Sequence, residues 1–239
     1  MDPKSISPDQ MVLWQWRFIT INATLLYTWV VMALLVVGSY LVTRRLSPRR
    51  QISRWQNLLE IVVSRMRTEI RELSRRDPDP YLPFVGTLFL FIVVANVLDV
   101  VPWFQAPTAS LSTAAALAIC VFVAVPVYGI LEQGVVSYLK RYVQPSPFMM
   151  PFHLIGEASR TLALAVRLFG NMMSSSKVVA VLLAVIPFFF PVVMQALGLL
   201  IGLIQAYIFA VLAMVYIASG LRQQPLAARE GGPAQEETQ

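Results

Sequence analysis

The chain has 239 residues, of which 57% are hydrophobic and only 13% are charged. Soluble domains carry about 25% charged residues, so this composition excludes an ordinary soluble protein and predicts an all-α integral membrane protein. The net charge of +6 does not indicate nucleic-acid binding, because the basic residues cluster beside a hydrophobic segment, as they do on the cytoplasmic side of membrane proteins. The single cysteine, Cys120, excludes an intrachain disulfide.

Five hydrophobic segments follow an N-terminal stretch, residues 1–20, that lacks the features of a cleaved signal peptide. A membrane-spanning helix needs roughly 20 apolar residues, and each of these segments reaches about that length. We therefore expect a single membrane domain over residues 21–220 with about five transmembrane helices. These helices should run over about residues 21–43, 81–101, 111–131, 153–186 and 192–219.

The distribution of basic residues predicts the orientation of the chain in the membrane. Arg44 and Arg45 begin a basic block after the first span, which places that side in the cytoplasm. With five spans, the N-terminal segment then lies outside the cytoplasm and the C-terminus lies inside. Arg222 and Arg229 agree with this orientation. Residues 221–239 are polar, and we expect them to form a disordered cytoplasmic tail.

The segment between Gln51 and Leu73 has a helical repeat of apolar and charged residues. Its apolar residues recur every three or four positions, which predicts an amphipathic helix. Such a helix can lie at the cytoplasmic interface of the membrane or pack against a soluble partner, and the sequence leaves both possibilities open. The apolar positions are Ile52, Trp55, Leu59, Val62, Met66, Ile70 and Leu73.

The last two hydrophobic segments are too long for upright crossings. A helix over residues 153–186 would be about 50 Å long, whereas the hydrocarbon core of a bilayer is about 30 Å thick. Pro187 and Pro191 mark a turn between this segment and the last one. We therefore expect a long, strongly tilted helical hairpin.

Arg167 is the most unusual residue of the chain, because it lies deep inside an apolar segment with no acid within one helical turn. Placing a charge there costs at least ~2.5 kcal/mol. At about 100° per residue, Asn171 and Ser174 share its helical face. That face could line an aqueous path or meet a carboxylate on another chain. The alternative is a structural arginine that binds backbone carbonyls.

Other polar residues in the last two segments have simpler explanations when each is taken alone. Glu157 and Arg160 lie near the start of the long segment, where they can pair with each other or reach the interface. Gln205 lies deep in the last segment, where it could make a hydrogen bond between helices. Gly198 and Gly202 have the spacing that allows two helices to approach closely.

Four motifs give the chain a family resemblance. They are Arg167-Leu168-Phe169-Gly170-Asn171-Met172, the run from Leu203 to Phe209, the run from Asn96 to Pro102, and Pro107-Thr108-Ala109 followed by Leu111. Together they cover most of residues 80–220. In order and spacing they resemble subunit a of the membrane (Fo) sector of rotary F-type ATP synthases.

The resemblance implies a function as the ion-translocating stator subunit. In that family, two offset half-channels load and unload the carboxylates of a rotating ring of c subunits. Arg167 matches the arginine between the half-channels, and Asn171 and Gln205 match residues that line the path or support the arginine. The implied partners are the c-subunit ring, b subunits, the remaining synthase subunits and membrane lipid. No cofactor, metal or nucleic acid is implied, and the implied location is the bacterial plasma (inner) membrane.

The chain also departs from the family pattern. Where many members have a glutamate or histidine, it has Ser176, followed by Lys177, and Gly198 replaces the usual titratable partner on the last helix. Ser110 replaces an aspartate, and His153 stands where many relatives have glutamate. The sequence therefore leaves H⁺ and Na⁺ open as the transported ion. Possible half-channel residues are Asp99, Ser110, His153, Glu157, Arg160, Ser174, Ser176 and Lys177.

Rival functions have less support from the sequence. The chain has no phosphate-binding loop, so ATP chemistry would belong to other subunits, and one histidine and one cysteine cannot form a His/Cys zinc cluster. An ion-coupled secondary transporter is the main alternative, but such proteins commonly have two similar halves, which this sequence lacks. A structural membrane anchor would leave Arg167 and Asn171 unexplained.

Overall fold

The computed structural model describes residues 12–16, 19–44, 54–74, 77–101, 104–136, 138, 148, 150–185 and 190–221. Two short antiparallel strands, β1 (Val12–Trp16) and β2 (Ile19–Asn22), come first. The helices α1 (Ala23–Arg44), α2 (Arg54–Ser74), α3 (Leu82–Leu98), α4 (Leu111–Gln133), α6 (Met150–Val185) and α7 (Phe190–Leu221) follow, with a 3₁₀ turn, η3 (Pro107–Ala109), before α4. Apart from the strand pair, which the sequence did not predict, the predicted helical fold is confirmed.

The predicted spans correspond to helices with small shifts at their ends. α1, α4, α6 and α7 are long and apolar enough to cross a membrane. α3 is shorter than predicted at 17 residues, because it ends at Leu98 and Asp99 caps it. α1 begins at Ala23, since Ile21 belongs to β2. Arg45, Arg222, Arg229 and the tail beyond residue 221 lie outside the described residues, so the orientation of the chain stays a prediction.

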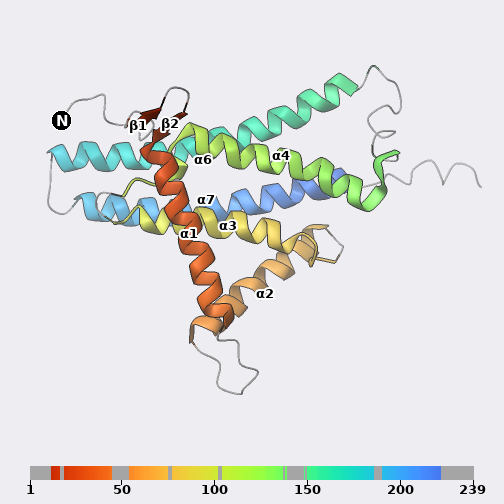
Figure 1. Ribbon diagram of the computed structural model, residues 1–239, viewed down its shortest axis with the longest axis horizontal. Helices are drawn as coiled ribbons and strands as arrows, with labels where there is room; N and C mark the ends of the chain where they lie inside the picture. The colour runs from red at the N-terminus through yellow and green to blue at the C-terminus, as the bar shows by residue number, and fades with distance from the viewer. Residues whose placement is uncertain are drawn as a thin grey trace, which may run out of the picture.

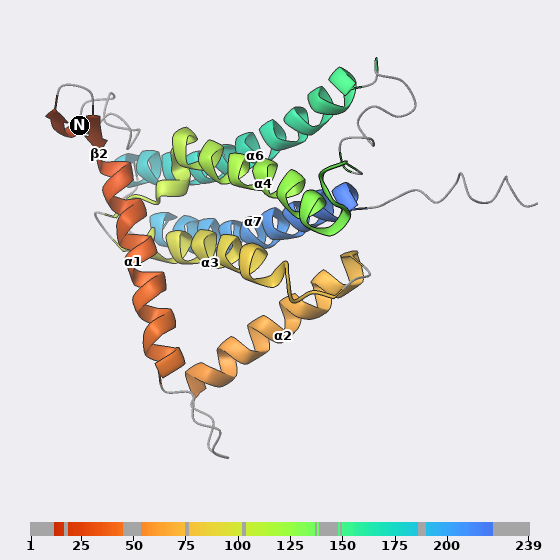
Figure 2. The same ribbon diagram turned by 45° about the vertical axis from the view of Figure 1, so that its right-hand side comes forward.

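The four helices α3, α4, α6 and α7 form the body of the molecule, and α1 crosses them at a steep angle in both views (Figures 1 and 2). At 1.5 Å per residue, α1 is about 33 Å long, whereas α6 and α7 are about 54 and 48 Å long. The length of α1 matches an upright crossing of a bilayer. If α1 stands upright, the long pair α6–α7 is strongly tilted, and this tilt stays a prediction.

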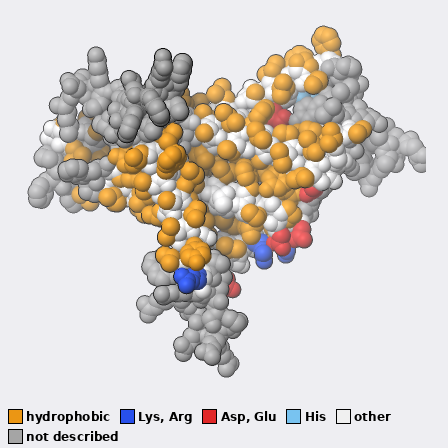
Figure 3. Space-filling view, in the orientation of Figure 1, with side chains coloured by type: hydrophobic (Ala, Val, Ile, Leu, Met, Phe, Trp, Pro, Cys, Tyr) orange, Lys and Arg blue, Asp and Glu red, His pale blue; other side chains and the backbone are white. Residues whose placement is uncertain are grey.

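Apolar side chains fill the core and also cover most of the outer surface in view (Figure 3). The core between α3, α6 and α7 contains residues such as Ile92, Leu168 and Phe209, all with no measurable exposure. Ala114 and Ala118 keep α4 close to this core. A surface this apolar is suited to lipid or to other membrane helices.

The amphipathic helix α2 packs against the chain's own helices. Ile70 is 2% exposed and lies in a buried cluster with Tyr81 and Val85 at the start of α3 and with Met214 and Ile217 of α7. The C-terminal half of the apolar face of α2 therefore has an intramolecular partner that the sequence did not reveal. The location of α2 at the membrane interface stays a prediction.

Charged residues flank the apolar face of α2, and charges gather near this helix in the space-filling view (Figure 3). Arg65 pairs with Glu69 at 3.2 Å, and Arg67 pairs with Asp79 at 3.0 Å. Both pairs are exposed to solvent over much of their length, so each contributes little to stability. The attachment of α2 to the rest of the chain depends mainly on its apolar contacts.

Replacing Ile70 with alanine should therefore loosen α2. Truncating a buried isoleucine costs roughly 2–5 kcal/mol, so Ile70→Ala should lower the melting temperature of the purified protein in detergent. Ile61→Ala is the matched control, because Ile61 lies on the same helix and is 61% exposed. Equal effects of the two substitutions would contradict the packing of α2 described above.

Candidate functional site

Polar groups of α7 and of the segment after α3 meet at Asp99, at the end of α3. The Asp99 carboxylate accepts a hydrogen bond from the backbone N–H of Ala106 at 3.0 Å. The side chain of Gln195, near the start of α7, donates to the Asp99 carbonyl at 3.1 Å. Ser110 lies buried just before α4, with its hydroxyl oxygen 2.6 Å from that of Ser112. The sequence predicted Asp99 and Ser110 as site residues but missed Gln195.

One face of α7 carries a row of positions that all meet polar groups. Gln195, Gly198, Gly202 and Gln205 are spaced three or four residues apart and so lie on one helical face; we call them the polar stripe. They extend over about 15 Å of the helix. The stripe begins beside Asp99 and ends at Gln205, which is 2% exposed.

The two glycines of the polar stripe provide room for side chains from other helices. A Cβ atom at Gly198 would overlap the hydroxyl of Ser175 on α6, and one at Gly202 would overlap the amide of Asn96 on α3. The sequence predicted that these glycines allow close helix approach. The structure shows that polar side chains occupy the space.

Ser175 presents its hydroxyl to α7, whereas the sequence named its neighbour Ser176. The hydroxyl of Ser176 donates instead to the carbonyl of Met172 on its own helix, at 3.0 Å. Adjacent residues on a helix point in different directions, so only one of them can face a given neighbour. Ser175, and not Ser176, lies beside Gly198. The sequence could not show this, because the contact depends on how α6 and α7 pack.

Arg167, Asn171, Ser174 and Lys177 lie on the exposed face of α6, as the helical repeat predicted for the first three. Within the part of the chain that the structure describes, Arg167 makes no ion pair. Asn171 differs from the others, because its side chain turns toward α7 and donates to the amide oxygen of Gln205 at 2.8 Å. This hydrogen bond links the face of α6 that carries Arg167 to the polar stripe of α7.

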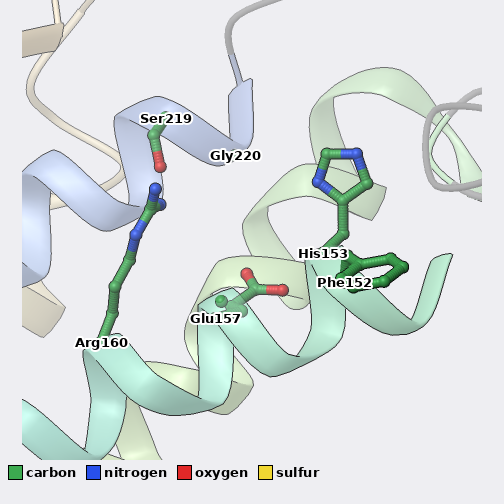
Figure 4. Close-up of a pocket in the computed structure, with 7 residues that line it drawn as sticks. Phe152, His153, Glu157, Arg160, Ser219 and Gly220 are labelled. Carbon is green, nitrogen blue, oxygen red and sulfur yellow. The ribbon is translucent and has the colours of Figure 1, made fainter. Parts of the chain in front are cut away.

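A cavity of about 240 Å³ lies at the opposite end of the α6–α7 pair. Figure 4 shows Arg160 extending from α6 toward Ser219 of α7, with Glu157 and His153 on the preceding turns. The structure thus brings together three predicted site residues, and it adds two α7 residues that the sequence missed. The cavity is lined by Phe152, His153, Gly156, Glu157, Arg160, Ser219 and Gly220.

Apolar packing separates the polar stripe from this cavity. Between Gln205 and Ser219, the inward face of α7 consists of buried apolar residues, some of which pack with Leu164 and Leu168 of α6 and the others with α2 and the start of α3. The interval spans about 21 Å of helix. Two polar regions therefore lie at opposite ends of α6–α7 without a polar connection through the described core. The apolar α7 residues are Ala206, Phe209, Ala210, Ala213, Met214, Ile217 and Ala218.

The described residues contain no group of three or more His, Cys, Asp or Glu side chains that could hold a metal ion. The polar groups of the site are mostly amides and hydroxyls, which bind water well and carry no charge. Arg167, Lys177 and Asp99 add ionisable groups, and Arg167 brings a planar guanidinium with five N–H donors. This chemistry is suited to a hydrated path beside a fixed positive charge.

Comparison with known proteins agrees with this geometry. The family profile described as "ATP synthase A chain" matches residues 25–218. The chain belongs to the ATP synthase A chain family. It is 56% identical to "ATP synthase subunit a 1" of Crocosphaera subtropica over 92% of this chain and 95% of the relative. It is 59% identical to "ATP synthase subunit a 2" of Acaryochloris marina over 90% and 92% of the two chains. For "ATP synthase subunit a" of Albidiferax ferrireducens the identity is 57% over 91% and 94%.

Membership of the ATP synthase A chain family confirms the predicted function. The chain is the non-catalytic, proton-translocating stator subunit of the Fo sector, and its partners are other subunits of the F-type ATP synthase. It is a multi-pass membrane protein. The alternatives of a secondary transporter and of a structural anchor are therefore wrong. The roles of individual residues depend on the geometry of the site.

The contact between Ser175 and Gly198 can be tested in the A chain by paired substitutions. Gly198→Ala should lower the thermal stability of the purified complex, because the new methyl group overlaps the Ser175 hydroxyl. Adding Ser175→Ala should restore stability, since the Cβ of Ser175 would lie at an ordinary 3.6 Å from the new methyl. Gly38→Ala, with no atom within 4 Å of the added carbon, serves as the control. A double variant as unstable as Gly198→Ala alone would contradict this contact.

Proposed function

We propose that Arg167 is the fixed charge that separates two proton half-channels, one along the polar stripe and one at the Glu157 cavity. The observation that carries this proposal is the position of Arg167 on the exposed face of α6. It lies about 10 Å along the helix from Arg160 of the cavity and one turn from Asn171, which bonds to the end of the polar stripe. Asn171 and Gln205 hold the end of the stripe beside the arginine.

The partner of Arg167 in this proposal is a carboxylate on the c-subunit ring. An arginine in a membrane without an ion pair is costly, and no described acid of the chain supplies one. Gly170 and Ser174 lie on the same exposed face, and small residues of this kind allow another helix to approach closely. Each ring carboxylate would meet Arg167 in its charged form and be protonated on either side of it.

The apolar packing between the two polar regions supports a path that passes through the rotor. A proton cannot cross about 21 Å of buried apolar side chains without polar groups or water. A proton that enters along the stripe must therefore leave the chain near Gln205 to reach the cavity. Transfer to a c-ring carboxylate, rotation of the ring and release at the cavity provide that step.

The orientation that suits this path has the N-terminus outside and the C-terminus in the cytoplasm of a bacterial plasma (inner) membrane. The polar stripe and the Asp99 cluster then face the outside, and the Glu157 cavity opens toward the cytoplasm beside α2. Asp99 and Ser110 would receive protons from outside, with Ser174, Ser175 and Lys177 along the route. His153, Glu157 and Arg160 would line the exit, and b subunits are further proposed partners.

The role of Arg167 predicts that even a conservative substitution is severe. Arg167→Lys keeps the charge but replaces a planar, five-donor group with a compact ammonium. Loss of a hydrogen bond to a charged partner costs up to about 3 kcal/mol, which corresponds to a roughly 100-fold decrease in rate, measured as ATP synthesis by inverted membranes. Arg67→Lys is the control, because Arg67 forms an exposed ion pair on α2. Near-normal synthesis by Arg167→Lys would refute the proposed role.

The coupling ion can be measured directly on the purified complex in proteoliposomes. ATP addition should acidify the lumen independently of Na⁺, and a protonophore should abolish the acidification, because water held by hydroxyls and amides can carry protons between Asp99, the c-ring and the cavity. Uptake of ²²Na⁺ that persists in the presence of the protonophore would show that sodium, and not the proton, is the transported ion. If neither ion moved while ATP was hydrolysed by an intact complex, the two-half-channel proposal would be wrong.

A further inference from the structure

Asn96 is held in a recess that only a glycine at position 202 can provide. Its side chain is 3% exposed at the contact of α3 with α7. The space that a Cβ atom at Gly202 would take is filled by the Asn96 amide. An amide this deeply buried between two helices has little access to bulk water. Its hydrogen-bonding groups must therefore be satisfied locally.

Two buried amide nitrogens, one in this recess and one on the next turn of α7, have no partner among the described residues. They are Nδ2 of Asn96 and Nε2 of Gln205. The oxygen of Gln205 is already used, because it accepts from Asn171 at 2.8 Å. Each amide nitrogen carries two N–H donors, so the recess has unpaired donors and requires an acceptor.

Helix geometry places the two side chains within one helical turn of each other on α7, because the Asn96 amide lies at Gly202. Residues three positions apart on a helix have Cβ positions about 5–6 Å apart, so Gln205 starts one turn from the recess at Gly202. Long side chains on a helix lean toward its N-terminus, which directs the Gln205 amide back toward Gly202 and Asn96. A single oxygen about 2.9 Å from each nitrogen can bridge a separation of this size.

We propose that Asn96 and Gln205 share one buried water molecule, and that Asn96 is thereby a positioning residue for Gln205. The water oxygen accepts a hydrogen bond from each amide, so its own O–H groups point away from both. The Gln205 amide is then held with its oxygen toward Asn171, one turn from Arg167. This inference rests on the proposed half-channel along the polar stripe and specifies how its inner end is fixed.

The first test removes the amide and keeps the shape. Asn96→Leu preserves a side chain branched at Cγ but cannot hold the water, so ATP-driven acidification by proteoliposomes should decrease about tenfold relative to ATP hydrolysis. Asn96→Ser should retain more activity than Asn96→Leu, because a hydroxyl can bind water again. Near-normal acidification by Asn96→Leu would overturn the inference, since a packing role alone requires only the shape.

The second test acts from the α7 side of the recess. Gly202→Ala should displace the Asn96 amide and reduce acidification, and the shorter side chain of Asn96→Ser in the double variant should leave room for the methyl group and restore part of it. Gly86→Ala on α3 is the control, because nothing lies within 4 Å of the added carbon. A double variant no better than Gly202→Ala would overturn the inference.

These tests separate the shared water from the proposed function. If Asn96→Leu is normal and Arg167→Lys is inactive, the water site is wrong and the half-channel proposal stands. If Arg167→Lys is also normal, the half-channel proposal itself is wrong. In each case the copurification of the whole complex shows that the variant has assembled.

Discussion

The fold depends on one constraint, which is that α6 carries a permanent charge within an apolar environment. Arg167 carries a guanidinium group, and the described residues give it no counter-ion. Burying it inside the chain would require an acid and a set of hydrogen bonds. The structure instead leaves it exposed on the outer face of α6, where another chain can supply the partner. The described part of the chain therefore does not supply the counter-ion that Arg167 needs.

Because α6 and α7 are long, one helix pair can carry polar residues at both of its ends. These polar regions lie beside Asp99 and around Glu157. Between these ends, buried apolar residues of α7 such as Phe209 and Met214 form a dry interval. Polar groups bind water, and a continuous row of them would let protons pass without doing work. The apolar interval is therefore as necessary to coupling as the polar ends.

The sequence predicted much of this arrangement, because helix length and hydrophobicity are local properties. It also placed Asn171 on the face of Arg167 from the helical repeat alone. It could not predict contacts set by packing. Gln195 reaches Asp99 from 96 positions away, and the choice between Ser175 and Ser176 depends on the rotation of α6 against α7. The intramolecular partner of Ile70 was hidden for the same reason.

The spacing of Gly198 and Gly202 on α7 suggests close helix packing, but the polar side chains beside them matter more. Glycine inside a helix costs about 1 kcal/mol relative to alanine, so two of them one turn apart weaken α7. If the only gain were closer packing, apolar atoms would fill the space. The space at Gly198 is filled by a hydroxyl and that at Gly202 by an amide. The cost of the glycines is thus offset by the room that they give to polar side chains of α3 and α6, on the same face of α7 as Gln205.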